Sequence, residues 1–309
     1  MVKVTDIKTG VIGIGLMGTY HSRIYKKCSK LVGISDINKE LGQNLSSELS
    51  VPFFQNHLEM LDVVDAISIA VPTNFHYDIA VDAIDRGVSV LIEKPLASNP
   101  LLSKKLIDYA KNKNVVLAVG HIERFNAVIT HFKERSLGKN EKIKSIFATR
   151  FSSYPSRIQD VGVVYDLTIH DIDLICDLFN SSPEAVQASS FITKNNIEEQ
   201  VSVLMHFKDG LFAICETTWH SPKKIRKVEV LTDKNFWILD LLNGQIIQTK
   251  DTSEDVITEV QSCNSLEIEI CDFLDAVKEQ KSPLVSGREG YRAVKIAEAI
   301  LSSIREKNS

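Results

Sequence analysis

The sequence predicts an α/β protein in which a doubly wound parallel sheet is followed by an α+β domain with a mostly antiparallel, open sheet. In residues 1–120, short apolar runs of strand length alternate with helical stretches, a rhythm typical of parallel sheets with helical crossovers. In residues 121–309, several strand-like runs follow one another through short turns, which is typical of antiparallel hairpins. At 309 residues the chain is long enough for two domains, which we place on either side of this change.

The elements of the first domain follow from apolar runs and helix caps. We expect strands at Thr9–Ile14, Leu31–Ser35, Ala66–Ala70, Val88–Ile92 and Val115–Val119, and helices at Leu16–Cys28, Lys39–Leu49, Phe75–Arg86 and Pro100–Lys111. Asn38 and Asn99 stand where N-caps belong, and Pro100 takes the first helical position. Strands separated by helices in this way pair in parallel through right-handed crossovers.

The second domain combines a few helices with a long series of strands. We expect helices near Ile122–Arg135, Asp166–Phe179, Ser265–Glu279 and Gly290–Arg305, and strands at Lys144–Phe151, Ala185–Ile192, Gln200–Phe207, Leu211–Thr218, Lys227–Thr232, Phe236–Leu241 and Gln245–Thr249. The turns at Gly210 and Gly244 join neighbouring strands into hairpins. The C-terminal helix can pack back on the first domain.

Composition excludes several classes of protein. The net charge of −4 argues against a general binder of nucleic acid or of membrane surfaces, which would carry a basic excess. The five cysteines are widely spaced without a C-x-x-C pair, a pattern that indicates reduced thiols and no zinc site. The N-terminus lacks the apolar segment of a signal peptide, and no run reaches the length of a membrane span. We therefore expect a cytoplasmic protein without a metal.

A glycine-rich loop follows the first strand and opens the first helix, as a dinucleotide-binding loop requires. Gly13 permits a tight turn, Gly15 lets the backbone approach a pyrophosphate, and Gly18 allows the helix to pack closely on the strand. Asp36, at the end of the second strand, is placed to hold the ribose 2′-hydroxyl, and its charge would repel a 2′-phosphate. The loop therefore predicts a Rossmann domain that binds NAD, although Asp36 could also begin a turn with Asn38.

Two further loops are expected at the same edge of the sheet. The loop Val71–Asn74 follows the third strand, and the tripeptide Glu93-Lys94-Pro95 follows the fourth. Loops at the carboxyl ends of parallel strands face the crevice where such sheets bind ligands. The predicted cofactor-binding residues are Gly13, Gly15, Leu16, Met17, Gly18, Asp36, Pro72, Thr73, Asn74, Glu93 and Lys94. Thr73 or Asn74 could also cap the following helix, and we expect His76 in its first turn to be structural.

A dense group of ionisable residues in the second domain supplies candidates for acid–base chemistry. If the segment is helical from about Val164, Asp166 and His170 lie one turn apart on the same face. A carboxylate beside an imidazole raises its basicity and fixes its orientation, which suits a general base. Asp173 lies near the same face. The acids could instead complement the helix dipole, and we discount a metal site because no further cluster has ligand spacing.

The three motifs together resemble the Gfo/Idh/MocA family of sugar and inositol dehydrogenases. A glycine loop, then Glu93-Lys94-Pro95, then the group from Asp166 to Asp173 occur in the family's order, and the resemblance covers essentially the whole chain. It implies NAD-dependent hydride transfer, with Lys94, Asp166 and His170 as the catalytic group between the two domains. It leaves open whether His170 or Lys94 takes the proton. It also implies a homo-oligomer, a dimer or tetramer built on the open sheet.

Two further segments resemble the branch of the family that oxidises the 3-hydroxyl of UDP-N-acetylglucosamine. They are residues 120–126 and the run from Arg150 to Arg157. The resemblance implies a nucleotide-sugar substrate, whose diphosphate needs cations or backbone donors. Arg124, Arg150 and Arg157 are candidates for that contact, Tyr154 could pack on a ring, and Asp173 completes the predicted substrate-binding residues. Surface arginines beside strands more often form ordinary ion pairs.

Three other functions remain open at this point. A dehydrogenase of the same family could act on a free sugar or on inositol. An oxidoreductase with this fold could reduce another kind of substrate, such as an imine. A non-catalytic nucleotide-sensing protein could keep the glycine loop, but it would have no reason to carry Lys94, Asp166 and His170 together.

Overall fold

The computed structural model of the chain describes residues 4–155, 161–192, 197–250 and 253–308. The chain divides into two compact units. The first comprises Met1–His121 and Leu266–Val294, and the second comprises Ile122–Ser265 and Lys295–Ser309. The first division lies between His121 and Ile122. Leu266–Val294, which the sequence assigns to the second domain, belongs to the first unit.

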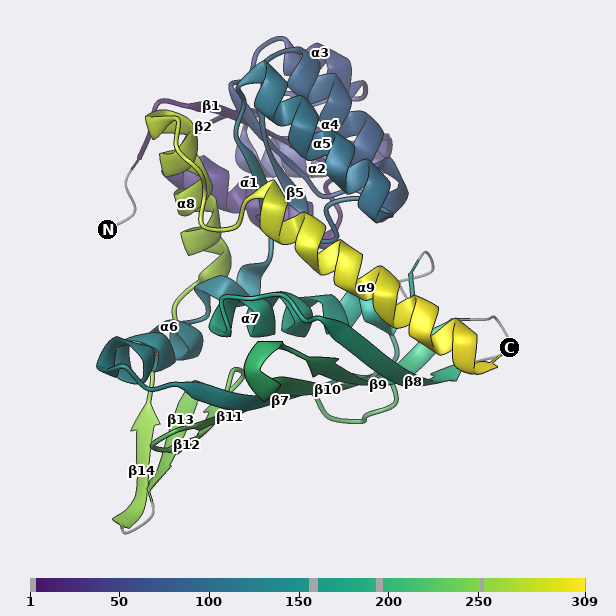
Figure 1. Cartoon of the computed structure of the whole chain (residues 1–309). Coiled ribbons are helices and arrows are strands. Elements are labelled where there is room, and N and C mark those ends of the chain that lie inside the picture. Colours follow the sequence, from purple (N-terminus) through teal and green to yellow (C-terminus); the bar gives the residue numbers. More distant parts are fainter. Residues whose placement is uncertain (1–3, 156–160, 193–196, 251–252, 309) are drawn as a thin grey trace. The chain divides into compact units, whose positions relative to one another are not determined.

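The first unit is a six-stranded parallel sheet with helices (Figure 1). Its elements are β1 (Lys8–Ile12), α1 (Leu16–Cys28), β2 (Lys30–Ser35), α2 (Lys39–Leu49), β3 (Phe53–Phe54), α3 (His57–Leu61), β4 (Ala66–Ile69), η1 (Thr73–Phe75), α4 (His76–Asp85), β5 (Ser89–Glu93), α5 (Pro100–Lys113), β6 (Leu117–Gly120), most of α8 (Ser265–Glu279) and the start of α9 (Gly287–Asn308). The strand order is β3-β2-β1-β4-β5-β6, so the order reverses between β1 and β4. Ligands of doubly wound sheets bind at this switch point.

The core of the first unit lies along its central strands. All four residues of β4 are buried, as are the first four of β5, which is expected where helices cover both faces of a parallel sheet. The caps expected at Asn38 and Asn99 are confirmed, because the side chains accept hydrogen bonds from Leu41 N and Leu102 N. The sequence missed β3 and α3, which have two and five residues and are too short for periodicity to identify.

The second unit is built on an eight-stranded sheet (Figure 1). Its strands are β7 (Ile143–Phe151), β8 (Ala185–Ile192), β9 (Glu198–His206), β10 (Phe212–Thr218), β11 (Ile225–Thr232), β12 (Phe236–Asp240), β13 (Gln245–Lys250) and β14 (Ser253–Glu259). Its helical elements are η2 (Ile122–Phe125), α6 (Ala127–Arg135), η3 (Leu137–Lys139), the π-helix η4 (Val164–Thr168), α7 (Ile169–Leu178) and η5 (Lys208–Gly210), with the remainder of α9.

The order in this sheet is β14-β13-β12-β11-β7-β10-β9-β8. The pair β7–β10 is parallel, whereas the other neighbours are antiparallel. The predicted fold class, a Rossmann sheet plus a mostly antiparallel sheet, is therefore confirmed. The sequence did not predict β14, an acidic edge strand whose charges obscure its apolar pattern. The helix expected over Ile122–Arg135 is divided at Asn126, which accepts a hydrogen bond from Val128 N and so caps α6.

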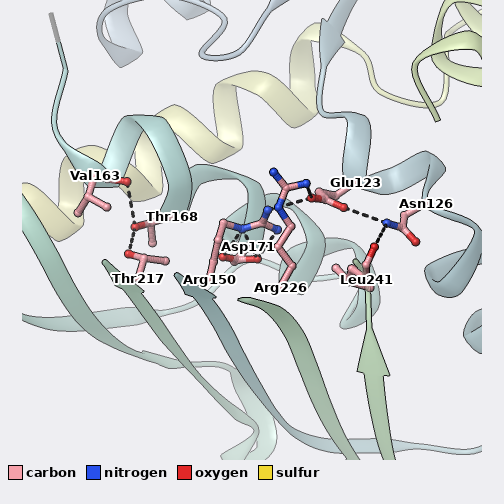
Figure 2. A network of polar contacts seen from close by, with 9 residues as sticks. All are labelled: Glu123, Asn126, Arg150, Val163, Thr168, Asp171, Thr217, Arg226 and Leu241. Carbon is pink, nitrogen blue, oxygen red and sulfur yellow. Dashed lines mark hydrogen bonds and ion pairs between the residues drawn. The ribbon is translucent and has the colours of Figure 1, made fainter. Parts of the chain in front are cut away.

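A buried ionic network fastens α7 to the sheet of the second unit (Figure 2). Arg150 on β7 donates to both carboxylate oxygens of Asp171 on α7, at 2.8 and 2.9 Å, and its Nη1 lies 2.8 Å from Glu123 Oε1 on η2. The Arg150 and Asp171 side chains are each 2% exposed. Burial opposes the charge of Arg150, but the two carboxylates outweigh it and raise the pKa of the guanidinium. One arginine thus joins β7, α7 and η2.

Replacing Arg150 by Met should strongly destabilise the second unit. The substitution leaves Asp171 and Glu123 buried without their cation, and breaking a buried ion pair in this way costs about 3–5 kcal/mol. Both tryptophans of the chain, Trp219 and Trp237, belong to the second unit, so their fluorescence during urea unfolding reports on that unit.

Arg226→Met is the matched control for this prediction. Arg226 contacts the same Glu123 at 3.4 Å, but its side chain is 39% exposed. Exposed pairs contribute about 0–1 kcal/mol, so the control should unfold close to the wild type. Equal losses in the two variants would show that burial of Arg150 does not decide its contribution.

Candidate active site

The glycine loop between β1 and α1 has the geometry of a phosphate-binding loop. Gly13 has φ +81°, and a Cβ on Gly18 would lie 1.8 Å from the Gly13 carbonyl oxygen. These two positions therefore require glycine for the chain's own packing. A Cβ on Gly15 would meet no atom within 4 Å. The open space at Gly15 fits a pyrophosphate that approaches the backbone, at the N-terminus of a helix.

Asp36 is part of the same loop structure. Its Oδ2 accepts a hydrogen bond from Ile14 N at 2.8 Å, and its Oδ1 accepts one from Asn38 N at 2.8 Å. The turn with Asn38 is thus present. Because each carboxylate oxygen has two lone pairs, Asp36 can also accept a hydrogen bond from a ribose hydroxyl. The residues of this loop fit NAD.

The loop after β4 carries Pro72, Thr73 and Asn74. Pro72 and Asn74 are exposed, and Thr73 is buried within η1. The expectation that Thr73 or Asn74 caps the next helix is wrong, because Phe75 precedes α4 without a side-chain cap. A single 3-10 turn leads into that helix instead. The exposed pair remains available to a ligand at the carboxyl end of β4.

His76 connects this loop to the tripeptide after β5. Its Nδ1 lies 2.7 Å from the Pro95 carbonyl oxygen, and its Nε2 lies 2.9 Å from the Val71 carbonyl oxygen. His76 is 1% exposed. The contacts hold the two predicted cofactor loops together, which is a structural role. A lone histidine in a sequence gives no signal of such a bridge.

Glu93 and Lys94 end β5 at the same edge of the sheet. The Lys94 amide lies 3.3 Å from Glu93 Oε2, and the Lys94–Pro95 peptide bond is cis. Burial opposes ionisation of Glu93, but a hydrogen bond from His21 and nearby positive charge outweigh it and lower the pKa of the carboxyl. Glu93 is therefore ionised at neutral pH beside Lys94.

In the second unit, Asp166 and His170 lie where a π-helix passes into α7. The Ile169 amide bonds to the Val164 carbonyl, five residues back, which identifies the wider turn. Such turns occur frequently at functional sites because they reorient side chains within a helix. The predicted helix is thus present, but its first turn is a π-turn, which no periodicity of apolar residues indicates.

Trp219 orients Asp166 and was not predicted from the sequence. Its Nε1 donates to Asp166 Oδ2 at 3.0 Å, and the residue is 2% exposed. The Tyr154 ring meets the Trp219 ring edge to face, with centroids 5.6 Å apart. The structure therefore brings the predicted ring-packing Tyr154 next to the tryptophan that holds Asp166. The separation of 53 positions between Asp166 and Trp219 explains why no spacing in the sequence connects them.

Arg124 and Asp173, both predicted to bind substrate, bind each other instead. Arg124 Nε and Nη2 donate to the Asp173 carboxylate at 2.6 and 2.8 Å, and Nη1 reaches Asp177. The Arg124 and Asp173 side chains are 4% and 2% exposed. This buried bidentate pair gives them a structural role, and Arg150 has one as well. Arg157 lies outside the described residues.

In the residues that the structure describes, no group of three or more His, Cys, Asp and Glu side chains could hold a metal ion. Within the same residues, no helix has both the length and the apolar character needed to cross a membrane.

Replacing Gly15 by Val should weaken NAD binding without destabilising the protein. The new side chain meets no protein atom close to its Cβ, so packing is retained, but it fills the space that the pyrophosphate needs. We expect a loss of at least about tenfold in NADH affinity, measured by fluorescence titration, as the lost contact exceeds about 1.4 kcal/mol. An unchanged affinity at an unchanged unfolding temperature would rule out this loop as the phosphate site.

Comparison with known proteins agrees with this geometry. Residues 7–121 match the oxidoreductase family with an NAD-binding Rossmann fold, and residues 120–236 match the GFO/IDH/MocA C-terminal domain. UDP-N-acetylglucosamine 3-dehydrogenase of Acidithiobacillus ferrooxidans is 28% identical over 94% of this chain and 95% of its own. A solved structure of that enzyme superposes with a TM-score of 0.93 at 27% identity, covering 98% of this chain and 99% of its own.

A more distant relative is scyllo-inositol 2-dehydrogenase (NAD(+)) of Bacillus subtilis, 24% identical over 97% of this chain and 94% of its own. Both relatives span nearly the full length of the chain. The Rossmann match precedes the C-terminal domain match along the chain. Together the two matches assign the protein to one family. The chain is a member of the Gfo/Idh/MocA family of NAD-dependent oxidoreductases.

Proposed function

We propose that this protein oxidises the 3-hydroxyl of a UDP-N-acetyl-hexosamine such as UDP-N-acetylglucosamine to the 3-keto sugar, with NAD as hydride acceptor. The observation that carries the proposal is the 28% identity to the Acidithiobacillus ferrooxidans enzyme along nearly the whole chain. The predicted catalytic residues support it, because Lys94, Asp166 and His170 are those that the family resemblance implies.

The proposed chemistry divides between the residues as follows. When bound, NAD supplies the acceptor for the hydride from carbon 3. His170 accepts the proton of the 3-hydroxyl, and Asp166 stabilises the resulting imidazolium. The hydrogen bond from Trp219 holds Asp166 in one orientation for this role. Lys94 donates a hydrogen bond to the same oxygen as it becomes a carbonyl. In the alternative, Lys94 itself takes the proton.

For the diphosphate we assign Arg157, with Tyr154 against a ring. Of the three arginines considered, Arg124 and Arg150 are occupied by buried carboxylates. A guanidinium that is already bound by a buried acid could contact a phosphate only by leaving that acid uncompensated. Tyr154 is 51% exposed, and its ring meets the Trp219 ring edge to face.

A substrate panel tests the proposed function. Purified protein is mixed with NAD and UDP-N-acetylglucosamine, its 6-carboxylate, other UDP-sugars, free sugars or inositol, and NADH absorbance is followed. The panel is repeated with a keto acid as oxidant, because tightly held NADH would hide turnover. Preference for UDP-sugars that is lost in Arg157→Ala is the expected result. Equal turnover of free sugars or inositol would favour a polyol dehydrogenase instead.

The two possible bases should differ in the pH dependence of kcat. We expect Lys94→Met and His170→Ala each to lower kcat by at least about a hundredfold, since a general base contributes about 10²–10⁴-fold. If His170 is the base, the acid limb of the kcat profile disappears in His170→Ala and persists in Lys94→Met. The opposite pattern would identify Lys94. Wild-type turnover in both variants would refute the site.

We further propose that the open face of the eight-stranded sheet joins copies of this chain. Along β7 and β10, partly exposed Phe147, Phe212 and Ile214 alternate with buried residues. The Phe147 and Phe212 rings meet edge to face at 6.0 Å. Leu231 on β11 is 43% exposed. Contiguous apolar side chains on a sheet face are typical of subunit interfaces.

Charges on this face should separate the subunits. We expect the wild type to be a dimer or tetramer in light scattering after gel filtration, and Phe212→Glu with Ile214→Glu to be a monomer, because association would bury the two new charges without partners. Val63→Glu, which changes an exposed apolar residue of the first unit, serves as the control and should keep the wild-type mass. A monomeric wild type would contradict the assignment of this face.

A further inference from the structure

A continuous row of hydrogen-bonded side chains leads to Glu93 inside the first unit. His21 Nε2 lies 3.0 Å from Glu93 Oε1, and His21 Nδ1 lies 2.8 Å from Ser68 Oγ. Tyr25 Oη lies 2.8 Å from the same Ser68 oxygen. Tyr25, His21 and Ser68 are fully buried, and the Glu93 side chain is 13% exposed. The row joins α1, β4 and the end of β5.

The order of donors in this row follows from counting hydrogens. Ionised Glu93 can only accept, so His21 Nε2 carries a hydrogen and donates to it. With neutral His21, Nδ1 accepts from the Ser68 hydroxyl, and the Ser68 oxygen accepts from Tyr25. Each hydrogen then meets one acceptor, which is the arrangement that buried polar groups adopt. Ser68 and Tyr25 therefore fix both the tautomer and the ring plane of His21.

We propose that His21 is a positioning residue for the reaction, holding Glu93 so that Glu93 in turn holds the Lys94 backbone at the carboxyl end of β5. The inference rests on the proposed catalytic role of Lys94. Glu93 Oε2 receives the Lys94 amide while Oε1 receives His21, so the two carboxylate oxygens face different partners. A carboxylate held at one oxygen by a rigid ring cannot rotate away from the other partner.

Four ionisable groups act on Glu93 across this region. His21 on α1, the adjacent Lys94 and His76 on α4 favour its charge. Glu269 on α8 is the fourth: burial, Glu93 and Asp272 raise its pKa well above the ordinary value, which opposes its ionisation. Removing the His21 hydrogen bond should raise the pKa of Glu93. Protonation of Glu93 would then begin at a higher pH than in the wild type.

The test compares His21→Leu with His21→Gln. Leucine removes the donor to Glu93, whereas glutamine places an amide hydrogen near the position of Nε2. With the sugar that gives the highest turnover in the panel, we expect His21→Leu to lower kcat by up to about a hundredfold. Its acid limb should move to higher pH, and His21→Gln should recover most of both changes. KM for the sugar should stay within about threefold, as no substrate contact is removed.

A purely structural His21 would give a different result. Both variants would then unfold at a lower temperature, while the acid limb of the kcat profile would stay where it is in the wild type. That outcome would overturn the proposal. Ser68→Ala removes only the group that orients the His21 ring. We therefore expect a smaller decrease in kcat, and a smaller shift of the acid limb to higher pH, than in His21→Leu. A wild-type pH profile in His21→Leu would be equally decisive against it.

Imidazole ¹⁵N NMR of histidine-labelled protein tests the row without any substrate. We expect one signal set of an Nε2–H tautomer that is missing in His21→Leu. A charged or Nδ1–H ring would contradict the proposed donor order. Lys94→Met and His170→Ala, measured in parallel, separate the two ideas: full turnover in both variants overturns the proposed site, whereas lost turnover in both with an unaffected His21→Leu overturns only the role of His21.

Discussion

The geometry of the second unit depends on the burial of one charged side chain, Arg150. A guanidinium removed from water is tolerated only where carboxylates surround it in good geometry. Asp171 and Glu123 meet that condition from two different elements, so the position of α7 on the sheet is set by charge as well as by apolar packing. The π-turn that carries Asp166 lies immediately before this fixed helix. Its side chains therefore project from a rigid support.

Much of this architecture follows from local patterns in the sequence. Alternating strands and helices predict the parallel sheet, and the glycine loop with Asp36 predicts the cofactor, because both depend on residues that are close in the chain. The ends of β4 and β5 are equally local, since the apolar runs stop at Pro72 and Glu93. Most elements of residues 1–120 could therefore be predicted, apart from the short β3 and α3.

The remaining features depend on partners that are distant in sequence. The local sequence around Arg124 does not distinguish an arginine that binds substrate from one that pairs with a buried acid beneath a helix. Only the fold shows that Asp173 is its partner. Trp219 and His21 illustrate the same limit, since each acts through a contact 53 or more residues away. Pairings that cross the fold cannot be identified from spacing along one chain.

Asp36 has a consequence for attempts to change the cofactor of this protein. Its two oxygens receive the amides of Ile14 and Asn38, so the acid that is predicted to bind the ribose also holds the glycine loop to the end of β2. A neutral or basic residue introduced there to admit a 2′-phosphate would release both amides at once. The preference for NAD and the conformation of the glycine loop thus depend on the same carboxylate. A useful redesign must supply new acceptors for those two amides before it alters the charge.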